Sequence, residues 1–321
     1  MKKPKVLVTR QVANEAVSLL ETAADVEVWK QDEPIPRELL LEKVESSDGI
    51  LAMLTERIDE ELLDRAQRLR VVANMAVGYD NIDLAACKKR DIWVTNTPDV
   101  LTEATADLAF ALMMATGRRL MEANRFLLNG EWKSWSPSLL AGQNVYGATL
   151  GIIGMGRIGE AVARRAKGFG MRILYHNRSQ KQQAEAEAET GAELVSLEAL
   201  LRESDYVVLL TPLTAETRLL MGEKQFSWMK PTSVFINVSR GGTVDETALY
   251  QALVKKQIWA AGLDVFQQEP VPLDHPLLTL PNVVALPHIG SATEQTRAEM
   301  ARLAAANIVA VLSGKRPLTP L

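Results

Sequence analysis

The chain has 321 residues, which is enough for two domains of ordinary size. Apolar residues make up 47% of it and charged residues 24%, a balance typical of folded proteins and too hydrophobic for a disordered chain. The net charge of −4 argues against nucleic acid or anionic lipid as a partner, because both need a basic surface. No apolar run reaches the roughly 18 residues of a membrane span, and the start MKKPKVLVTR lacks a signal-peptide core, so we expect a cytoplasmic protein. The single cysteine, Cys87, excludes an internal disulfide and a thiolate zinc site, and we expect no metal.

Short apolar, β-branched runs alternate with helical patterns along the first hundred residues. Strands are predicted at 5–9, 26–29, 49–54 and 71–74, and helices at 15–24, 37–46 and 59–68. This alternation predicts parallel strands covered by helices. The series breaks around Asn96-Thr97-Pro98, and the next pattern predicts one long helix over 102–129.

A second βα series runs from residue 149 to about 287, after a loop at 130–148 that is rich in Gly, Ser, Trp and Pro. A final helix is predicted at 292–312, with its apolar residues on one stripe. The fold class is therefore α/β, with two Rossmann-like or flavodoxin-like domains built on parallel sheets. The first domain ends near Pro98, and the pattern alone leaves open which domain the final helix joins.

The sequence GIIGMGRIG at 151–159 places Gly154, Gly156 and Gly159 in the spacing G-x-G-x-x-G. An apolar strand precedes it, an amphipathic helix follows, and a second strand at 171–175 closes a βαβ unit. In this setting the glycines permit a tight turn, close approach of a pyrophosphate, and packing of the helix on the strand. The start of the helix, at Arg157 and Ile158, offers N–H groups to the phosphates. The motif predicts a dinucleotide site.

The end of that second strand indicates which dinucleotide binds. An acidic residue there would bind the ribose of NAD, but the sequence reads Tyr175-His176-Asn177-Arg178-Ser179. The guanidinium of Arg178 suits a phosphate, and Asn177 and Ser179 can add neutral hydrogen bonds. NADP is the predicted cofactor.

The chain has three histidines. His176 lies next to the proposed phosphate pocket, and His275 lies in PLDHP, where the turn residues predict a surface loop. His288 follows the apolar strand at 283–286, at the end of a parallel strand where α/β folds bind ligands.

Two further residues follow strands in the same way: Glu269 comes after the strand at 260–265, and Arg240 after the one ending near Val238. Side chains at successive strand ends can converge over one crevice. Arginine binds a carboxylate through two hydrogen bonds, and histidine passes a proton near neutral pH, the more so when a carboxylate orients it. Arg240, Glu269 and His288 are the predicted catalytic residues.

The order of the Gly-rich loop, NVSRGG, GLDVF with Glu269 shortly after, and PHIGSAT resembles the D-isomer-specific 2-hydroxyacid dehydrogenases. The resemblance covers essentially the whole chain, including AVGYDNID at 76–83. It implies an oxidoreductase in which His288 protonates the keto oxygen as hydride arrives. Glu269 would hold His288 charged, and Arg240 would grip the 2-oxo acid.

The resemblance also implies roles that the residues alone do not. Backbone N–H groups of Val77 and Gly78 would bind the substrate carboxylate, and Asp264 would contact the nicotinamide carboxamide. The substrate-binding domain would be discontinuous, 1–98 plus 290–321, around a dinucleotide-binding domain at 99–289, with the active site in the cleft between them and a homodimer formed through the cofactor domain. The full predicted cofactor set is Gly154, Gly156, Arg157, Ile158, Gly159, Asn177, Arg178, Ser179, Thr211, Pro212, Val238, Asp264 and Gly290, with Thr211 and Pro212 on the adenosine side.

Within the family, TPDVLTEATADLAFALMMATGRR, NGEWKSW and the missing acid after the second strand resemble the glyoxylate/hydroxypyruvate reductase branch. This branch implies NADPH-dependent reduction of glyoxylate to glycolate and of hydroxypyruvate to D-glycerate. Trp135 is predicted to wall a pocket for a small 2-oxo acid, in its own subunit or in a partner. Two alternatives remain at this stage, a 2-ketogluconate reductase on the same scaffold and a nucleotide-sensing protein similar to a transcriptional corepressor. The sequence does not rank glyoxylate, hydroxypyruvate and 2-ketogluconate as substrates.

Overall fold

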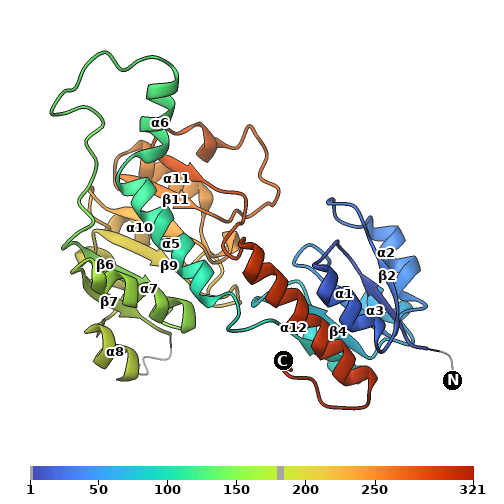
Figure 1. Ribbon diagram of the computed structural model, residues 1–321. Helices are drawn as coiled ribbons and strands as arrows, with labels where there is room; N and C mark the ends of the chain where they lie inside the picture. Colours follow the sequence, from blue (N-terminus) through green and yellow to red (C-terminus); the bar gives the residue numbers. More distant parts are fainter. Residues whose placement is uncertain (1–2, 179–183) are drawn as a thin grey trace. The chain divides into compact units, whose positions relative to one another are not determined.

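The computed structural model describes residues 3–178 and 184–321, and the chain divides into two compact units (Figure 1). The first comprises Met1–Leu101 and Ala292–Leu321, and the second is Thr102–Ser291. Ser179, predicted to bind the cofactor, lies outside the described residues. In the described ranges, no helix combines the length and apolar character that crossing a membrane requires.

The first unit is built on a five-stranded parallel sheet in the order β2-β1-β3-β4-β5. Its central strands are buried along their whole length, as expected for a parallel sheet with helices on both faces. Its elements are β1 Lys5–Val8, α1 Asn14–Glu21, β2 Asp25–Val28, α2 Arg37–Val44, β3 Gly49–Ala52, α3 Glu60–Arg65, β4 Val71–Asn74, α4 Leu84–Lys89, β5 Trp93–Thr95 and α12 Glu294–Leu312.

Helix α12 comes from the far end of the chain and packs against α1, β3 and β4 of this unit. The buried Asn307 holds the tail that follows it: its Oδ1 accepts hydrogen bonds from the backbone N–H groups of Leu318 (2.8 Å) and Thr319 (3.0 Å). The Thr319 hydroxyl in turn donates to the carbonyl of Asn96 at 2.6 Å. The final helix and tail are thus part of the first sheet's core.

The second unit is built on a seven-stranded parallel sheet in the order β12-β11-β10-β9-β6-β7-β8. The strand order reverses at β6, which lies between β7 and β9, and such a switch point is where open α/β sheets bind ligands. Its elements are α5 Thr102–Gly117, α6 Leu120–Leu128, β6 Thr149–Ile153, α7 Arg157–Gly168, β7 Arg172–His176, α8 Ala184–Thr190, β8 Glu193–Leu194, α9 Leu197–Glu203, β9 Tyr206–Leu209, α10 Glu223–Trp228, β10 Val234–Asn237, η1 Gly241–Thr243, α11 Glu246–Val254, β11 Ala260–Leu263, η2 Pro276–Thr279 and β12 Val283–Ala285. The two parallel sheets confirm the predicted α/β class.

One predicted element is wrong: the segment at 102–129 forms two helices rather than one. Helix α5 ends at Gly117, whose carbonyl accepts a hydrogen bond from the Gln143 backbone N–H at 2.8 Å. Arg119 then adopts the left-handed conformation (φ 53°), which turns the chain before α6 begins. The break arises from a contact with a loop residue 26 positions away, which the local helical pattern does not contain.

Candidate active site

The Gly-rich loop has the geometry of a phosphate-binding turn. Gly154 has φ of 102°, a conformation that side chains rarely adopt, and its N–H donates to the carbonyl of His176 on the adjacent strand (2.9 Å). A methyl group added at Gly159 would lie 2.6 Å from the Gly154 carbonyl, whereas one added at Gly156 would meet no atom within 4 Å. Helix α7 begins at Arg157 directly after this open position, and its N-cap residue Gly156 has no side chain that could cover the helix N-terminus. The turn fits a pyrophosphate.

Two polar groups near the switch point support the same site. The Asn177 side chain holds the loop, because its Oδ1 accepts from the Met155 N–H at 2.7 Å and its Nδ2 donates to the Met155 carbonyl at 3.2 Å. Thr211 follows strand β9, and its buried hydroxyl has no hydrogen-bond partner among the described residues. A buried hydroxyl without a partner is costly unless a ligand satisfies it. Pro212 next to it is exposed, and Val238 after β10 is buried.

Arg178 lies at the end of β7, with 73% of its side chain exposed. Its Nη1 is 3.3 Å from Glu216 Oε2. The hydrogen bond from the Thr214 hydroxyl and, more weakly, the charge of Arg178 lower the pKa of the Glu216 carboxyl. An anionic carboxylate therefore lies beside the residue predicted to bind the 2′-phosphate of NADP, a feature that the sequence pattern does not reveal.

The turn that carries His288 is organised by Asp264, which is 1% exposed. Its carbonyl accepts from the His288 N–H (2.9 Å), and its carboxylate oxygens accept from the N–H groups of Ile289 and Gly290, each at 2.8 Å. Burial raises the pKa of Asp264, while these N–H groups and the charge of His288 act in the opposite direction. The turn holds His288 in the left-handed conformation, with φ of 54°.

His288 and Glu269 form a hydrogen-bonded pair, as predicted from their positions after β12 and β11. His288 Nδ1 lies 2.6 Å from Glu269 Oε2, and the other carboxylate oxygen accepts from the Phe266 N–H at 3.0 Å. Burial raises the pKa of Glu269, but the hydrogen bond and charge of His288, the Phe266 N–H and the charge of Arg240 outweigh it and lower the pKa. Glu269 is therefore a carboxylate at neutral pH, and it leaves Nε2 of His288 for a substrate.

Arg240 lies after β10 and is coupled to the Glu269 loop through its neighbour Gly241. The Arg240 carbonyl accepts from the Asn237 side chain at 3.1 Å and from the Thr243 hydroxyl at 2.6 Å, which fixes the backbone there. A methyl group at Gly241 would overlap the peptide bond between Phe266 and Gln267. Because β10, β11 and β12 are parallel neighbours, Arg240, Glu269 and His288 all lie at the carboxyl-terminal edge of the sheet, where the strands end.

The predicted carboxylate-binding turn, Val77 and Gly78, lies in the first unit. The carbonyl of Val77 accepts from the Asn96 side chain at 2.9 Å, and that of Gly78 from the Asn74 side chain at 2.8 Å. The Asn81 side chain donates to the carbonyls of Met53 and Glu56, which joins this turn to the loop after β3.

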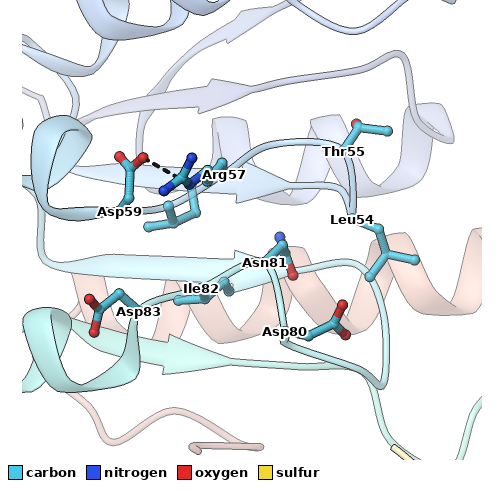
Figure 2. Close-up of a pocket in the computed structure, with 9 residues that line it drawn as sticks. Leu54, Thr55, Arg57, Asp59, Asp80, Asn81, Ile82 and Asp83 are labelled. Carbon is cyan, nitrogen blue, oxygen red and sulfur yellow. Dashed lines mark ion pairs between the residues drawn. The ribbon is translucent and has the colours of Figure 1, made fainter. Parts of the chain in front are cut away.

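These two loops line a pocket with a volume of about 450 Å³. Its lining, drawn in Figure 2, consists of residues 54, 55 and 57–59 of one loop and 80–83 of the other. The two loops are paired at Ile58 and Ile82, which form an isolated parallel bridge. Three asparagines and this bridge thus hold the turn; Asn81 belongs to the AVGYDNID motif, whereas Asn74 and Asn96 lie outside it.

The sequence analysis also singles out Trp135 and His275. Trp135 lies on the loop at 130–148 with 78% of its side chain exposed, and its role in a pocket stays a prediction. His275 is not a simple surface residue, as the turn pattern had suggested, because its ring is half-buried and lies 3.2 Å from Glu246.

A Rossmann sheet with this Gly-rich turn and an imidazole–carboxylate pair at its edge defines a dinucleotide-dependent oxidoreductase. The family model described as "D-isomer specific 2-hydroxyacid dehydrogenase, NAD binding domain" matches residues 110–290. The chain is 53% identical to the glyoxylate reductase of Thermococcus gammatolerans, over 99% of this chain and 95% of that protein. The chain belongs to the D-isomer-specific 2-hydroxyacid dehydrogenase family.

Solved structures agree with this assignment. The TT0316 protein of Thermus thermophilus has a TM-score of 0.92 at 45% identity, covering 99% of both chains. An NADPH-dependent glyoxylate/hydroxypyruvate reductase of Sinorhizobium meliloti, in complex with NADP and malonate, has a TM-score of 0.85 at 35% identity, covering 100% of this chain and 97% of that one.

The packing of Gly241 yields a first prediction. Replacing Gly241 with Ala forces its methyl group into the Phe266–Gln267 peptide and displaces the loop that carries Glu269, so we expect turnover to fall by about 100-fold. The matched control is Gly242→Ala, whose methyl group would first meet the flexible Leu213 side chain at 3.1 Å and should change turnover by less than about fivefold. Equal effects of the two variants in steady-state kinetics, both being folded by circular dichroism, would contradict this coupling.

Proposed function

We propose that the protein reduces small 2-oxo acids with NADPH, converting glyoxylate to glycolate and hydroxypyruvate to D-glycerate. The observation that carries the proposal is the 2.6 Å pair of His288 and Glu269 at the edge of a dinucleotide-binding sheet. The similarity to glyoxylate reductases over almost the whole chain supports the choice of acid.

His288 is the proposed proton donor. A nicotinamide nucleotide held by the Gly-rich turn would supply the hydride that reduces the carbonyl carbon of the acid. Negative charge then develops on the keto oxygen, and an imidazolium held at that oxygen neutralises it by giving up a proton from Nε2. Glu269 holds the ring through Nδ1 at 2.6 Å, and its carboxylate stabilises the positive charge that the ring carries before it gives up the proton.

Two further groups are proposed to bind the acid. The guanidinium of Arg240 binds and polarises the 2-oxo acid through paired hydrogen bonds, which need its planar fork. The N–H groups of Val77 and Gly78 bind the carboxylate, and their turn is held for this by Asn96 and Asn74. None of these roles requires a metal.

The test is NADPH oxidation measured in parallel with glyoxylate, hydroxypyruvate and 2-ketogluconate. We expect turnover with the first two acids and a lower kcat/KM with the bulkier third. A preference for 2-ketogluconate would contradict the proposed substrate. Tight binding of the nucleotide without turnover of any acid would instead favour a nucleotide-sensing protein.

The hydrogen-bonded pair of His288 and Glu269 predicts a specific pH dependence of turnover. Glu269→Gln keeps the size of the side chain but removes the charge that favours the imidazolium of His288. Reduction requires the protonated ring and is lost as pH rises through its titration, so this basic limb should move to lower pH in the variant. Rates well below that limb should suffer less. A pH profile of kcat that coincides with that of the parent would show that the two residues are not coupled.

Cofactor preference is predicted to depend on Arg178 and, in the opposite sense, on Glu216. Arg178→Ala should raise KM for NADPH at least severalfold, because it removes one charge-assisted contact to the phosphate. KM for NADH should stay nearly unchanged. Glu216→Gln removes the carboxylate that competes with the phosphate for Arg178, so it should lower KM for NADPH by about twofold to fivefold. If either variant changes KM for NADPH and KM for NADH equally, this pocket does not bind the 2′-phosphate.

We also propose that the protein is a homodimer formed through the cofactor domain. Helix α6 and the loop after it extend from the seven-stranded sheet (Figure 1). This segment exposes several large apolar side chains, and such a cluster is typical of an interaction surface. These side chains are Leu127, Leu128, Trp132, Trp135 and Tyr146. Light scattering should give about twice the chain mass of 35.4 kDa, and Leu128→Glu should shift it toward that of the single chain. A monomeric parent would contradict the proposal.

A further inference from the structure

The second unit contains another imidazole–carboxylate pair, outside the proposed proton relay. His275 Nε2 lies 3.2 Å from Glu246 Oε2, and the two side chains are only 19% and 14% exposed. Glu246 is the first residue of α11, where the positive end of the helix dipole stabilises a carboxylate. His275 is the residue before η2.

Glu246 binds both ends of the loop that carries Glu269. Its Oε1 accepts from the Gln267 backbone N–H at 2.7 Å, and its Oε2 faces His275. The Gln267 side chain donates a further bond to the carbonyl of Val244 (2.6 Å), two residues before the start of α11. Glu269 lies between these two anchor points, so a single carboxylate closes the segment 267–275 into a loop.

The His275 ring is oriented for this contact. Its Nδ1 accepts from the Leu277 N–H at 3.4 Å, which leaves Nε2 as the nitrogen that donates to Glu246. The ring also lies edge-on against Phe266, with the centroids 6.0 Å apart. The Phe266 N–H in turn donates to Glu269 Oε1 at 3.0 Å. A short series of contacts therefore connects His275 and Glu246 to Glu269.

We propose that Glu246 and His275 are positioning residues, which clamp the loop 267–275 so that Glu269 stays bonded to His288. The proposal rests on the proposed function, since it assigns the clamp a role in the same relay. A bond of 2.6 Å tolerates little displacement, and a misplacement of about 1 Å in an active site can cost 100-fold in rate.

The test follows the titration of His288 directly. The chain has only three histidines, so ¹³Cε1-histidine labelling gives three signals, which His176→Gln and His275→Gln assign. In Glu246→Ala we expect His288 to titrate at lower pH than in the parent, and kcat to fall by about tenfold to 100-fold. NADPH affinity, measured by fluorescence, should stay within about twofold.

Matched variants separate positioning from general stability. His275→Ala should shift the His288 titration in the same direction, whereas His275→Gln keeps a donor for Glu246 and should restore most of the parent kcat. The control is Glu223→Ala, which removes an exposed acid from the first position of another helix, α10, and should leave the titration unchanged. If Glu246→Ala does not fold, the His288 titration and kcat of His275→Ala and His275→Gln test the same proposal.

Two results would overturn different claims. If Glu246→Ala and His275→Ala lower the melting temperature but His288 titrates as in the parent, the pair is merely structural and the clamp is wrong. If His288 in Glu269→Gln titrates as in the parent, the proposed relay itself fails, whatever Glu246 does.

Discussion

The active-site edge of the second unit depends on the buried carboxylate of Asp264. His288 adopts a left-handed backbone conformation, which costs a non-glycine residue about 1–2 kcal/mol. Each hydrogen bond from a backbone N–H to a charged group contributes about 1.5–3 kcal/mol, and Asp264 accepts two of them from the next two residues of the turn. These bonds oppose the strain and hold the turn, so the imidazole lies at the strand end where Glu269 meets it.

The parallel sheet explains why residues so far apart in the chain can cooperate. Strands β10, β11 and β12 are neighbours and run in one direction, so the segments that follow them emerge at one edge. Arg240, Glu269 and His288 each come from one of these segments. The same edge, at the switch point between β6 and β9, presents the Gly-rich turn and the Thr211 hydroxyl, which has no hydrogen-bond partner in the part of the chain that the structure describes. The Gly-rich turn and the His288–Glu269 pair thus share one scaffold, and the close packing of Gly241 on the next loop links its parts.

The features that the sequence predicts well are those encoded locally. Glycine spacing and strand periodicity give the phosphate turn, and the loops that follow apolar strands give the segments in which His288 and Glu269 meet. The features it does not predict come from contacts between distant segments. Glu246 meets His275 across 29 positions, Arg178 meets Glu216 across α8, β8, α9 and β9, and the Gly117 carbonyl at the end of α5 is bonded by Gln143. Hydrogen bonds of this kind leave no periodic signal, because any polar residue at these positions fits the local pattern.

The most direct test of the proton-donor assignment is a crystal structure with NADP and oxamate, a 2-oxo acid analogue that is not reduced. We predict His288 Nε2 within about 3 Å of the oxamate oxygen that replaces the keto oxygen, with the Nδ1 bond to Glu269 intact. Oxamate bound with that oxygen away from His288, or a ring that has left Glu269 in the complex, would contradict the central claim that this pair delivers the proton.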